Sequence, residues 1–321
     1  MTLQDSHKTG AVDIVIPVYC EKPEALAATL SACQKQTYPI FKIFVIDDGS
    51  PEPISIPAGV ESVPQISLIR LHQNGGISAA RNAAIACSNA NLIACINTEI
   101  LPNPDWLSTC ANYLFEHPCV GACYTRVVPL EPNRILTRWR MRFQEPKYGG
   151  RSGPTEFAHG HAVLFRKEAV DTVGGYDVHY RRHHEDWDIC RRMKEFGWES
   201  HYVAVSACIS IQEDSLRSLA IKQLRDSDWF SPTEDSLIRL YVHLSKWTLI
   251  RAGRNVVKGR LYLLPVDLAI WASALWIATS LTLRAIGEGD GRPGTPFSDS
   301  KSSSARSQGP TDDPSERSRE G

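Results

Sequence analysis

The chain has 321 residues, of which 42% are hydrophobic and 22% are charged, a composition that allows one large globular domain with appendages. Its formal net charge is −1, so no overall field draws the molecule to nucleic acid or to an anionic surface. We therefore expect no nucleic-acid partner, and any basic patch must be local.

The cysteines and the first residues both indicate a cytosolic protein. Nine cysteines, an odd number, lie mostly in apolar runs and include no Cys-x-x-Cys pair. This pattern is typical of reduced, buried thiols and not of a disulfide framework or a zinc site. Residues 1–10 are polar and lack the apolar stretch of a secretory signal, so we expect a flexible N-terminus and an active domain that faces the cytosol.

Strand and helix patterns alternate along the first hundred residues. Residues 12–18 (VDIVIPV) are β-branched and nearly continuously apolar, as in a central strand buried on both faces, and Pro23 then stands at the first position of a predicted helix. Further strands are predicted at 42–47, 66–71 and 92–96, and an alanine-rich helix at 77–88. The alternation predicts an α/β fold with a doubly wound, mostly parallel sheet, whose ligands bind at the carboxyl ends of the strands.

Polar side chains follow two of these strands at the point where a ligand is expected. Asp47 and Asp48 end one strand, and Asn97 and Glu99 follow another. Solvated turn residues are the alternative interpretation, because carboxylates and amides are common in turns. Two such clusters at the ends of neighbouring strands favour a binding site.

The following residues complete a catalytic domain that we expect to span 11–215. Residues 126–160 are rich in Arg, Trp, Pro and Gly and predict an irregular loop on the acceptor side. Residues 186–196 (DWDICRRMKEF) predict a helix that ends at Gly197. Residues 287–321 contain almost no aliphatic side chains, so we expect a disordered tail.

Several motifs together carry a family resemblance. They are IPVYCEKPEALAATLSACQKQTYP from Ile16, IDDGS at 46–50, NGGISAARNAAI at 74–85, INTEILPNPDWL at 96–107 and GGYDVHYRRHHEDWDICRRMKEFGW at 174–198. In this order and spacing, over about two thirds of the chain, they resemble the family 2 glycosyltransferases with the glycosyltransferase-A fold, which is nucleotide-diphospho-sugar transferase-like. The resemblance implies an enzyme that moves a sugar from a nucleotide-sugar donor to a hydroxyl group with inversion.

The resemblance also implies roles for the residues that would bind the nucleotide. Asp48 would contact the nucleobase with Asp47 close by, since a carboxylate accepts strongly from a base N–H, and Pro17 and Tyr19 would form the adjacent wall of the base pocket. Arg81 would lie near the diphosphate, where a guanidinium suits phosphate oxygens. The alternative for Arg81 is an ordinary surface arginine on a helix.

The metal motif departs from the family pattern. The usual Asp-x-Asp, which holds Mg²⁺ or Mn²⁺ against the diphosphate, reads Asn97-Thr98-Glu99, so Glu99 is the candidate metal ligand. Asn97 can still accept or donate hydrogen bonds through its amide, and we expect it to bind the nucleotide sugar. Many members supply a histidine ligand where this chain has Ser210. His201 is nearby in sequence, although a lone histidine beside a strand is more often structural. Metal dependence stays open on the sequence alone.

The acidic pair at Glu185 and Asp186 matches the part of the family motif that supplies the catalytic base. Asp186 would remove the proton of the acceptor hydroxyl, while Glu185, Trp187 and His161 would line the sugar or acceptor site. The alternatives are that Asp186 is an N-cap or first-turn acid favoured by the helix dipole and that Trp187 packs in the core.

The C-terminal part combines basic and apolar segments. We expect a basic helical extension at 216–260 and a membrane-associated segment at 261–286, with membrane contact through 236–286. The basic residues that precede the apolar run, without an acidic one among them, are Arg239, Lys246, Arg251, Arg254, Lys258 and Arg260. Basic residues beside an apolar run favour the cytoplasmic face of the cell membrane.

Whether the apolar segment spans the bilayer is left open by the sequence. Pro265 and Asp267 lie near its start and shorten the uninterrupted apolar part. The alternative is a helix packed on the catalytic domain.

The sequence therefore predicts an inverting glycosyltransferase that uses a nucleotide-sugar donor and a glycan, lipid-linked or other hydroxyl acceptor. A non-catalytic nucleotide-sugar-binding or scaffold protein is the alternative suggested by the altered metal motif. A nicotinamide-dependent oxidoreductase is disfavoured, because no Gly-x-Gly-x-x-Gly follows the first strand.

Overall fold

The computed structural model describes residues 11–60, 64–144, 148–181, 183–226 and 236–287. The predicted flexible N-terminus and, apart from Gly287, the predicted disordered tail lie outside the described residues. The chain divides into two compact units, one up to Ser215 and one from Leu216 onward.

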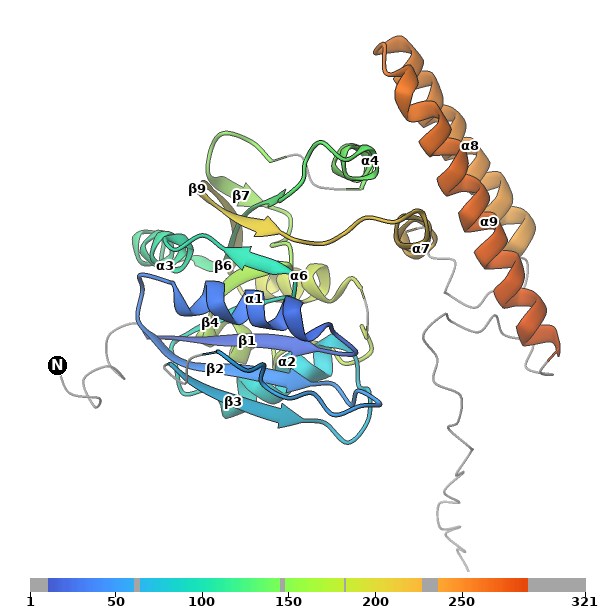
Figure 1. The fold of residues 1–321 in the computed structure, drawn as a ribbon. Coiled ribbons are helices and arrows are strands. Elements are labelled where there is room, and N and C mark those ends of the chain that lie inside the picture. The colour runs from blue at the N-terminus through green and yellow to red at the C-terminus, as the bar shows by residue number, and fades with distance from the viewer. Residues whose placement is uncertain (1–10, 61–63, 145–147, 182, 227–235, 288–321) are drawn as a thin grey trace, which may run out of the picture. The chain divides into compact units, whose positions relative to one another are not determined.

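A mixed β-sheet forms the centre of the first unit (Figure 1). The described strands are β1 (Val12–Val18), β2 (Ile40–Asp47), β3 (Gln65–Arg70), β4 (Leu92–Ile96), β5 (Ile100–Pro102), β6 (Val120–Pro129), β7 (Gly153–Thr155), β8 (Ala162–Arg166) and β9 (Glu199–Ser210). Their order is β3-β2-β1-β4-β8-β6-β9-β5, and β7 pairs with β9. The pairs among β1 to β4 are parallel, whereas β8 is antiparallel to both β4 and β6. The α/β prediction is confirmed, and the parallel pattern holds for the first four strands.

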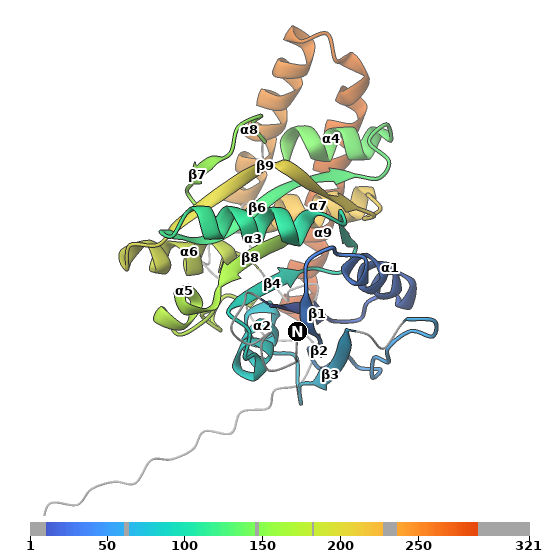
Figure 2. The ribbon, with the colours of Figure 1, turned by 90° about the vertical axis from the view of Figure 1, so that its left-hand side faces the viewer.

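Helices cover both faces of this sheet (Figure 2). They are α1 (Pro23–Gln34), α2 (Ile77–Cys87), α3 (Trp106–Glu116), α5 (Lys167–Thr172) and α6 (Glu185–Glu195), and a further helix, α4 (Ile135–Phe143), follows β6. Ile14 of β1 packs in one core layer with residues of α1 and α3, while its neighbour Val15 packs in the other layer with residues of α2, α5 and α6. A strand buried on both faces reads as a continuous apolar run, which explains why β1 was predicted correctly.

The irregular loop predicted at 126–160 was wrong for much of its length. Strand β6 runs on to Pro129, α4 and β7 follow, and residues 145–147 are outside the described part. Helix α4 was hidden by its arginines. Arg140 lies in the interior beside a fully buried Trp139 and pairs with Asp214 at 2.8 Å, so a charged residue occupies a position that a periodicity argument assigns to an apolar one.

Three helices make up the described part of the second unit. They are α7 (Leu216–Asp226), α8 (Ser236–Val257) and α9 (Leu264–Gly287), with a short 3₁₀ turn at Leu261–Leu263. Helices α8 and α9 pack together as an antiparallel hairpin, and α7 packs against α9. Pro265 is the second residue of α9, where a missing N–H breaks no helical hydrogen bond, so it starts this helix and does not interrupt it.

Candidate active site

The acidic turn lies where the sequence placed it, at the carboxyl edge of the parallel strands. Pro17 pairs with Ile46 and Val18 with Asp47 in the β1–β2 register, so the residues that follow both strands are neighbours. Asp48 continues this pairing, because its backbone N–H donates to the carbonyl of Val18 at 2.9 Å. Tyr19, directly after β1, is therefore brought to the same edge as the two aspartates.

Asp47 is engaged by the protein itself. Its carboxylate is buried and accepts hydrogen bonds from the backbone N–H of Ser50 at 2.9 Å and from Arg70 Nη1 at 2.7 Å. Burial alone would raise the pKa of Asp47, but the bonds from Ser50 and the charge of Arg70 outweigh it and lower the pKa. Asp47 thus stabilises the turn that presents Asp48.

Asp48 joins this turn to the start of α2. Its Oδ1 and Oδ2 accept hydrogen bonds from the backbone N–H groups of Gly75 and Gly76, each at 2.8 Å. Burial raises the pKa of Asp48 in spite of these bonds. Each carboxylate oxygen can accept a second bond, so the predicted contact with a nucleobase N–H is compatible with the geometry.

Arg181 is a residue near this turn that the sequence analysis missed. Its exposed guanidinium donates to the side-chain oxygen of Asn74 at 3.2 Å, and its charge opposes the rise in the pKa of Asp48. Gly76 has φ +87°, and a Cβ there would lie 2.5 Å from the carbonyl oxygen of Arg181. The only sequence signal was a pair of arginines before the acidic motif, which says nothing of a contact 107 residues apart.

Arg81 is buried, so its interpretation as a surface arginine was wrong. Its guanidinium has no exposed surface, and Nη1 donates to Glu185 Oε1 at 3.0 Å. Nη2 donates to Asn97 Oδ1 at 3.0 Å and to the carbonyl of Gly160 at 2.8 Å, and the group lies over the ring of Tyr176. Arg81 therefore joins α2, the end of β4, the turn at Gly160 and the start of α6. Its predicted contact with a diphosphate stays a prediction.

Asp186 lies in the first turn of α6 and is linked to Arg81 through one glycine. The N-cap residue of α6 is His184, so the N-cap alternative for Asp186 was wrong and the first-turn position was right. Asp186 Oδ2 accepts from the N–H of Gly160 at 3.1 Å, and Oδ1 accepts from the N–H of Trp187 at 2.9 Å. A Cβ at Gly160 would lie 3.3 Å from both Arg81 Nη2 and Asp186 Cβ, so a side chain there would crowd both residues.

The other predicted acceptor residues surround this point. Glu185 is buried against Arg81, which gives it a positioning role that the sequence did not predict. Trp187 is half-buried, with the guanidinium of Arg191 5.7 Å from its ring centre. The carbonyl of His161 accepts from the N–H of Asn97 at 2.9 Å. Contact of these three side chains with an acceptor stays a prediction.

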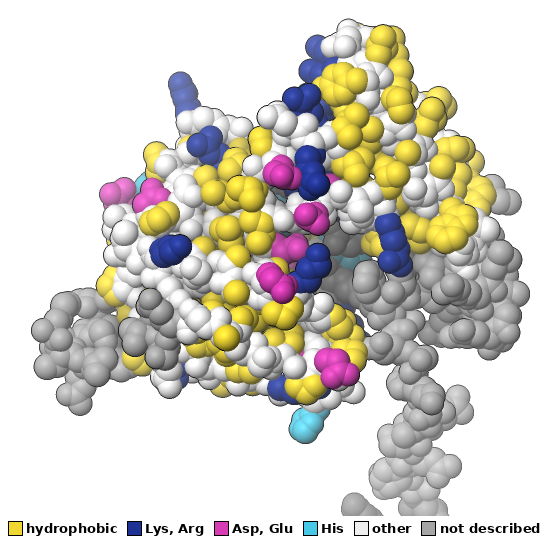
Figure 3. Space-filling model, in the orientation of Figure 1, with side chains coloured by type: hydrophobic (Ala, Val, Ile, Leu, Met, Phe, Trp, Pro, Cys, Tyr) yellow, Lys and Arg dark blue, Asp and Glu magenta, His cyan; other side chains and the backbone are white. Residues whose placement is uncertain are grey.

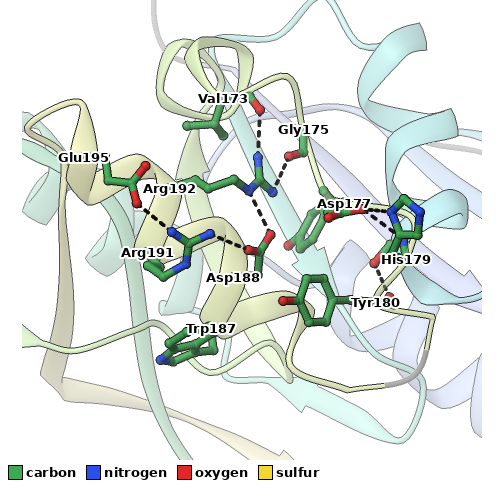
Figure 4. A network of polar contacts seen from close by, with 12 residues as sticks. Val173, Gly175, Asp177, His179, Tyr180, Trp187, Asp188, Arg191, Arg192 and Glu195 are labelled. Carbon is green, nitrogen blue, oxygen red and sulfur yellow. Dashed lines mark hydrogen bonds and ion pairs between the residues drawn. The ribbon is translucent and has the colours of Figure 1, made fainter. Parts of the chain in front are cut away.

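A network of arginines and one aspartate anchors α6 (Figure 4). Asp188 is buried and accepts from Arg191 at 3.1 Å and from Arg192 at 2.8 Å. Arg192 in turn donates to the carbonyls of Val173 and Gly175 at 2.7 and 2.9 Å. These bonds fix the helix that carries Asp186 to the loop before it.

Glu99 lies in a partly buried and acidic environment. Its φ is +66°, an uncommon backbone conformation for a residue other than glycine. Burial raises its pKa, and the negative charges of Glu21 and Glu213 raise it further against the opposing charge of Lys22. A bound cation would offset this accumulation of negative charge.

Neither Ser210, which stands where many members have a histidine ligand, nor His201, the histidine weighed as a ligand, is free of other contacts. Ser210 is buried at the end of β9, where its Oγ accepts from the N–H of Gln212 at 3.3 Å. His201 is bonded at both ring nitrogens, to the hydroxyl of Tyr113 at 2.9 Å and to Glu199 at 2.7 Å, so it is structural.

The described ranges contain no group of three His, Cys, Asp or Glu side chains that could hold a metal ion. Mg²⁺ keeps several waters and binds through one or two carboxylates together with substrate phosphates. The residues present therefore fit an ion to which Glu99 contributes one ligand.

Comparison with known proteins identifies the family. Residues 13–174 match the model described as glycosyl transferase family 2, which is slightly more than half of the chain, so the chain belongs to this family. It has the glycosyltransferase-A fold, as the sequence predicted, and family membership supports an enzyme over the non-catalytic alternative.

Two curated relatives and one solved structure illustrate the similarity. The chain is 26% identical over 307 residues to an N-acetylglucosaminyltransferase of Bradyrhizobium diazoefficiens, covering 85% of this chain and 62% of that protein. It is 25% identical over 183 residues to a pre-mycofactocin glycosyltransferase of Mycobacterium tuberculosis, covering 55% of this chain and 38% of that protein. The alignments thus span less than two thirds of either relative. The crystal structure of GalNAc-T7 with UDP, GalNAc and Mn²⁺ superposes with a TM-score of 0.51 at 12% identity, covering 66% of this chain and 47% of that one, a likeness of fold alone.

Proposed function

We propose that this glycosyltransferase moves a sugar from a nucleoside-diphosphate sugar to an acceptor hydroxyl by single displacement, with inversion at the anomeric carbon. The observation that carries the proposal is the position of Asp186, whose carboxylate is held by the N–H of Gly160 beside the buried pair of Arg81 and Glu185 and the partly buried Asn97. The first turn of a helix stabilises a negative charge, which favours the ionised form that a base requires. Asp186 takes the proton of the acceptor hydroxyl. At the same time the hydroxyl oxygen of the acceptor bonds to the anomeric carbon, and the nucleoside diphosphate leaves.

Glu99 is the residue that would hold a divalent cation beside the donor. Its partly buried position between other carboxylates supports this assignment, and one carboxylate is enough where phosphate oxygens and water complete the coordination. A Mg²⁺ or Mn²⁺ ion bound there would neutralise charge on the departing diphosphate.

We expect Glu99→Ala to lose transfer together with any Mn²⁺-dependent binding of the donor, and Glu99→Asp to retain part of both. The reason is that Glu99 is the only acid left in the altered motif. Transfer and calorimetric donor binding are measured with Mn²⁺ and with excess EDTA for the parent and both variants. Glu116→Ala, which removes an exposed acid at the end of α3, is the control. Full activity of the parent in EDTA would remove the ion from this mechanism.

The α8–α9 hairpin supports a membrane location, because several large apolar side chains lie on its outer surface while two polar side chains lie between its helices. Asn255 and Asp267 have no exposed surface and bond to each other at 2.8 Å between the helices. Large apolar side chains instead face outward, on the region that Figure 3 shows in yellow over α8 and α9. The large apolar residues with more than half of their surface exposed are Val242, Leu249, Val256, Val257, Leu261, Leu268 and Trp276.

The length of the apolar segment and the nearby charges point the same way. Among the described helices, one segment, Leu261–Ser280, is long and apolar enough to cross a bilayer. Buried core helices of soluble proteins share that composition, but only 39% of its most apolar window is buried. The exposed Arg254 and Lys258 near the end of α8 suit anionic lipids, whereas Arg251 pairs with Asp267 inside the hairpin. We assign the enzyme to the cytosolic face of a membrane, where a glycan, lipid-linked or other hydroxyl acceptor is presented.

The membrane assignment predicts that the full chain partitions to membranes and that a chain ending at Ser215 stays in the soluble fraction. The cut falls between the two compact units, so α7 is removed together with α9, against which it packs. Fractionation of gently lysed cells measures the difference. In the full chain, Val257→Glu should weaken partitioning, because a carboxylate is costly in the bilayer and repels anionic lipids. Val205→Glu, at a 76% exposed position of the first unit, should not. Equal fractionation of the two chains would contradict the assignment.

A further inference from the structure

The amide of Asn97 has a fixed orientation. Its partner at 3.0 Å is Arg81 Nη2, and a guanidinium carries only hydrogen-bond donors. The Asn97 atom facing Arg81 must therefore be the oxygen, which turns the amide nitrogen away from this cation. Within the described residues, that nitrogen donates to no acceptor, although Asn97 is partly exposed at the carboxyl edge of β4.

This orientation makes Asn97 a poor metal ligand and a good ligand for an anion. An amide nitrogen has no lone pair to offer a metal ion, and its oxygen lies 3.0 Å from the positive charge of Arg81, which repels a second cation. The same charge polarises the amide, because hydrogen bonds in a chain strengthen one another. The outward N–H groups are therefore strengthened donors, suited to a negatively charged oxygen.

We propose that Asn97 donates a hydrogen bond directly to a diphosphate oxygen of the sugar donor, and that Arg81 is the positioning residue that holds the amide in this sense. The proposal rests on the proposed function, since it assigns the ligand of the same site. Position 97 supplies a neutral donor where the family motif has a carboxylate, so the diphosphate is held at this position without a bridging ion. Glu99 keeps its separate place as the ligand of any bound cation.

The proposal also explains why Arg81 is buried. The guanidinium has no exposed surface, so it could contact the diphosphate itself only by moving away from Glu185, Asn97 and the Gly160 carbonyl. Acting through the Asn97 amide, Arg81 strengthens phosphate binding while its own hydrogen bonds stay intact.

The test is metal-free binding of nucleoside diphosphates. The parent, Asn97→Ala, Asn97→Asp and the control Asn91→Asp are titrated calorimetrically with UDP, GDP, ADP, CDP and dTDP, in excess EDTA and in Mn²⁺. Asn91 is exposed and directly precedes β4, so Asn91→Asp adds the same charge at the opposite end of the strand. Thermal unfolding of each variant checks its fold, which Asn97→Asp should retain because a carboxylate can also accept from Arg81.

We expect the parent and Asn91→Asp to bind one of these nucleotides in EDTA. Asn97→Ala should bind it about 10-fold more weakly or worse in EDTA, as for a hydrogen bond to a charged group. Asn97→Asp should lose at least as much nucleotide affinity in EDTA, because its carboxylate repels the diphosphate. Addition of Mn²⁺ should increase the affinity of Asn97→Asp by a larger factor than it increases that of the parent.

Three results would overturn the proposal. Equal EDTA binding by the parent and Asn97→Ala would show that the amide does not contact the ligand. Binding by the parent in Mn²⁺ alone would overturn the direct contact and leave the transferase proposal standing. Binding of no nucleotide under either condition would overturn both.

Discussion

Asp186→Asn should reduce glycosyl transfer by about 10²-fold or more, the usual contribution of a general base, while the nucleoside diphosphate still binds. An amide of the same shape cannot take up the acceptor's proton at neutral pH. The amide can also satisfy only one of the two backbone donors, Gly160 N–H and Trp187 N–H, that the carboxylate now accepts. We therefore expect a loss of stability of about 1–3 kcal/mol beside the loss of rate. Initial rates per folded molecule, with urea unfolding in parallel, separate the two effects.

The matched control for this substitution is Asp188→Asn. Asp188 is two residues further along α6 and is buried between Arg191 and Arg192, so its replacement disturbs the same helix without touching the proposed base. We expect a loss of stability with a nearly normal rate in the folded fraction. If Asp186→Asn turned over near the parental rate, or if both variants lost rate equally, the base assignment would fail.

Arg81→Met should destabilise the first unit by about 3–5 kcal/mol, because it leaves Glu185 as an unpaired charge in a buried position. The carbonyl of Gly160 and the oxygen of Asn97 lose their donor in the same step. Equilibrium unfolding in urea at neutral pH measures the change.

Two comparisons make the Arg81 result specific. The double variant Arg81→Met/Glu185→Leu should recover part of the stability, since removing both members of a buried pair costs less than removing one. Arg191→Met, at a 44% exposed side chain, should change stability by about 1 kcal/mol or less. A small effect of Arg81→Met, or a double variant no more stable than the single one, would contradict the account of this pair.

Local patterns predicted the elements well where a strand or helix has a uniform environment. Strand β1 was clear because both of its faces are buried, and α6 was clear because Gly197 ends it with φ +87°. Helix α4 was missed because its buried Arg140 finds its partner at Asp214, far along the chain. A periodicity argument treats a charged residue as exposed, because it cannot show that a distant residue of opposite charge pairs with it.

The site shows the same division between local and distant information. The sequence placed Asp47, Asp48 and Asn97 at one edge, because the ends of parallel strands meet there. It could not show that Arg81 is buried, since its partners Asn97, Gly160 and Glu185 lie 16, 79 and 104 residues away. Contacts of that kind depend on how the sheet is assembled.

The side-chain bonds along the α8–α9 hairpin have a mechanical consequence. Tyr241 contacts Thr279, Trp271 Nε1 donates to Ser245 at 3.1 Å, and Asn255 bonds to Asp267, so pairs recur from one end of the hairpin toward the other. Sliding one helix past the other by a single turn would break all of them together. The pair therefore behaves as one rod, and at ~1.5 Å per residue the 22 residues of α8 give it a length of ~33 Å. A force applied at one end of such a rod displaces the other end by the same amount.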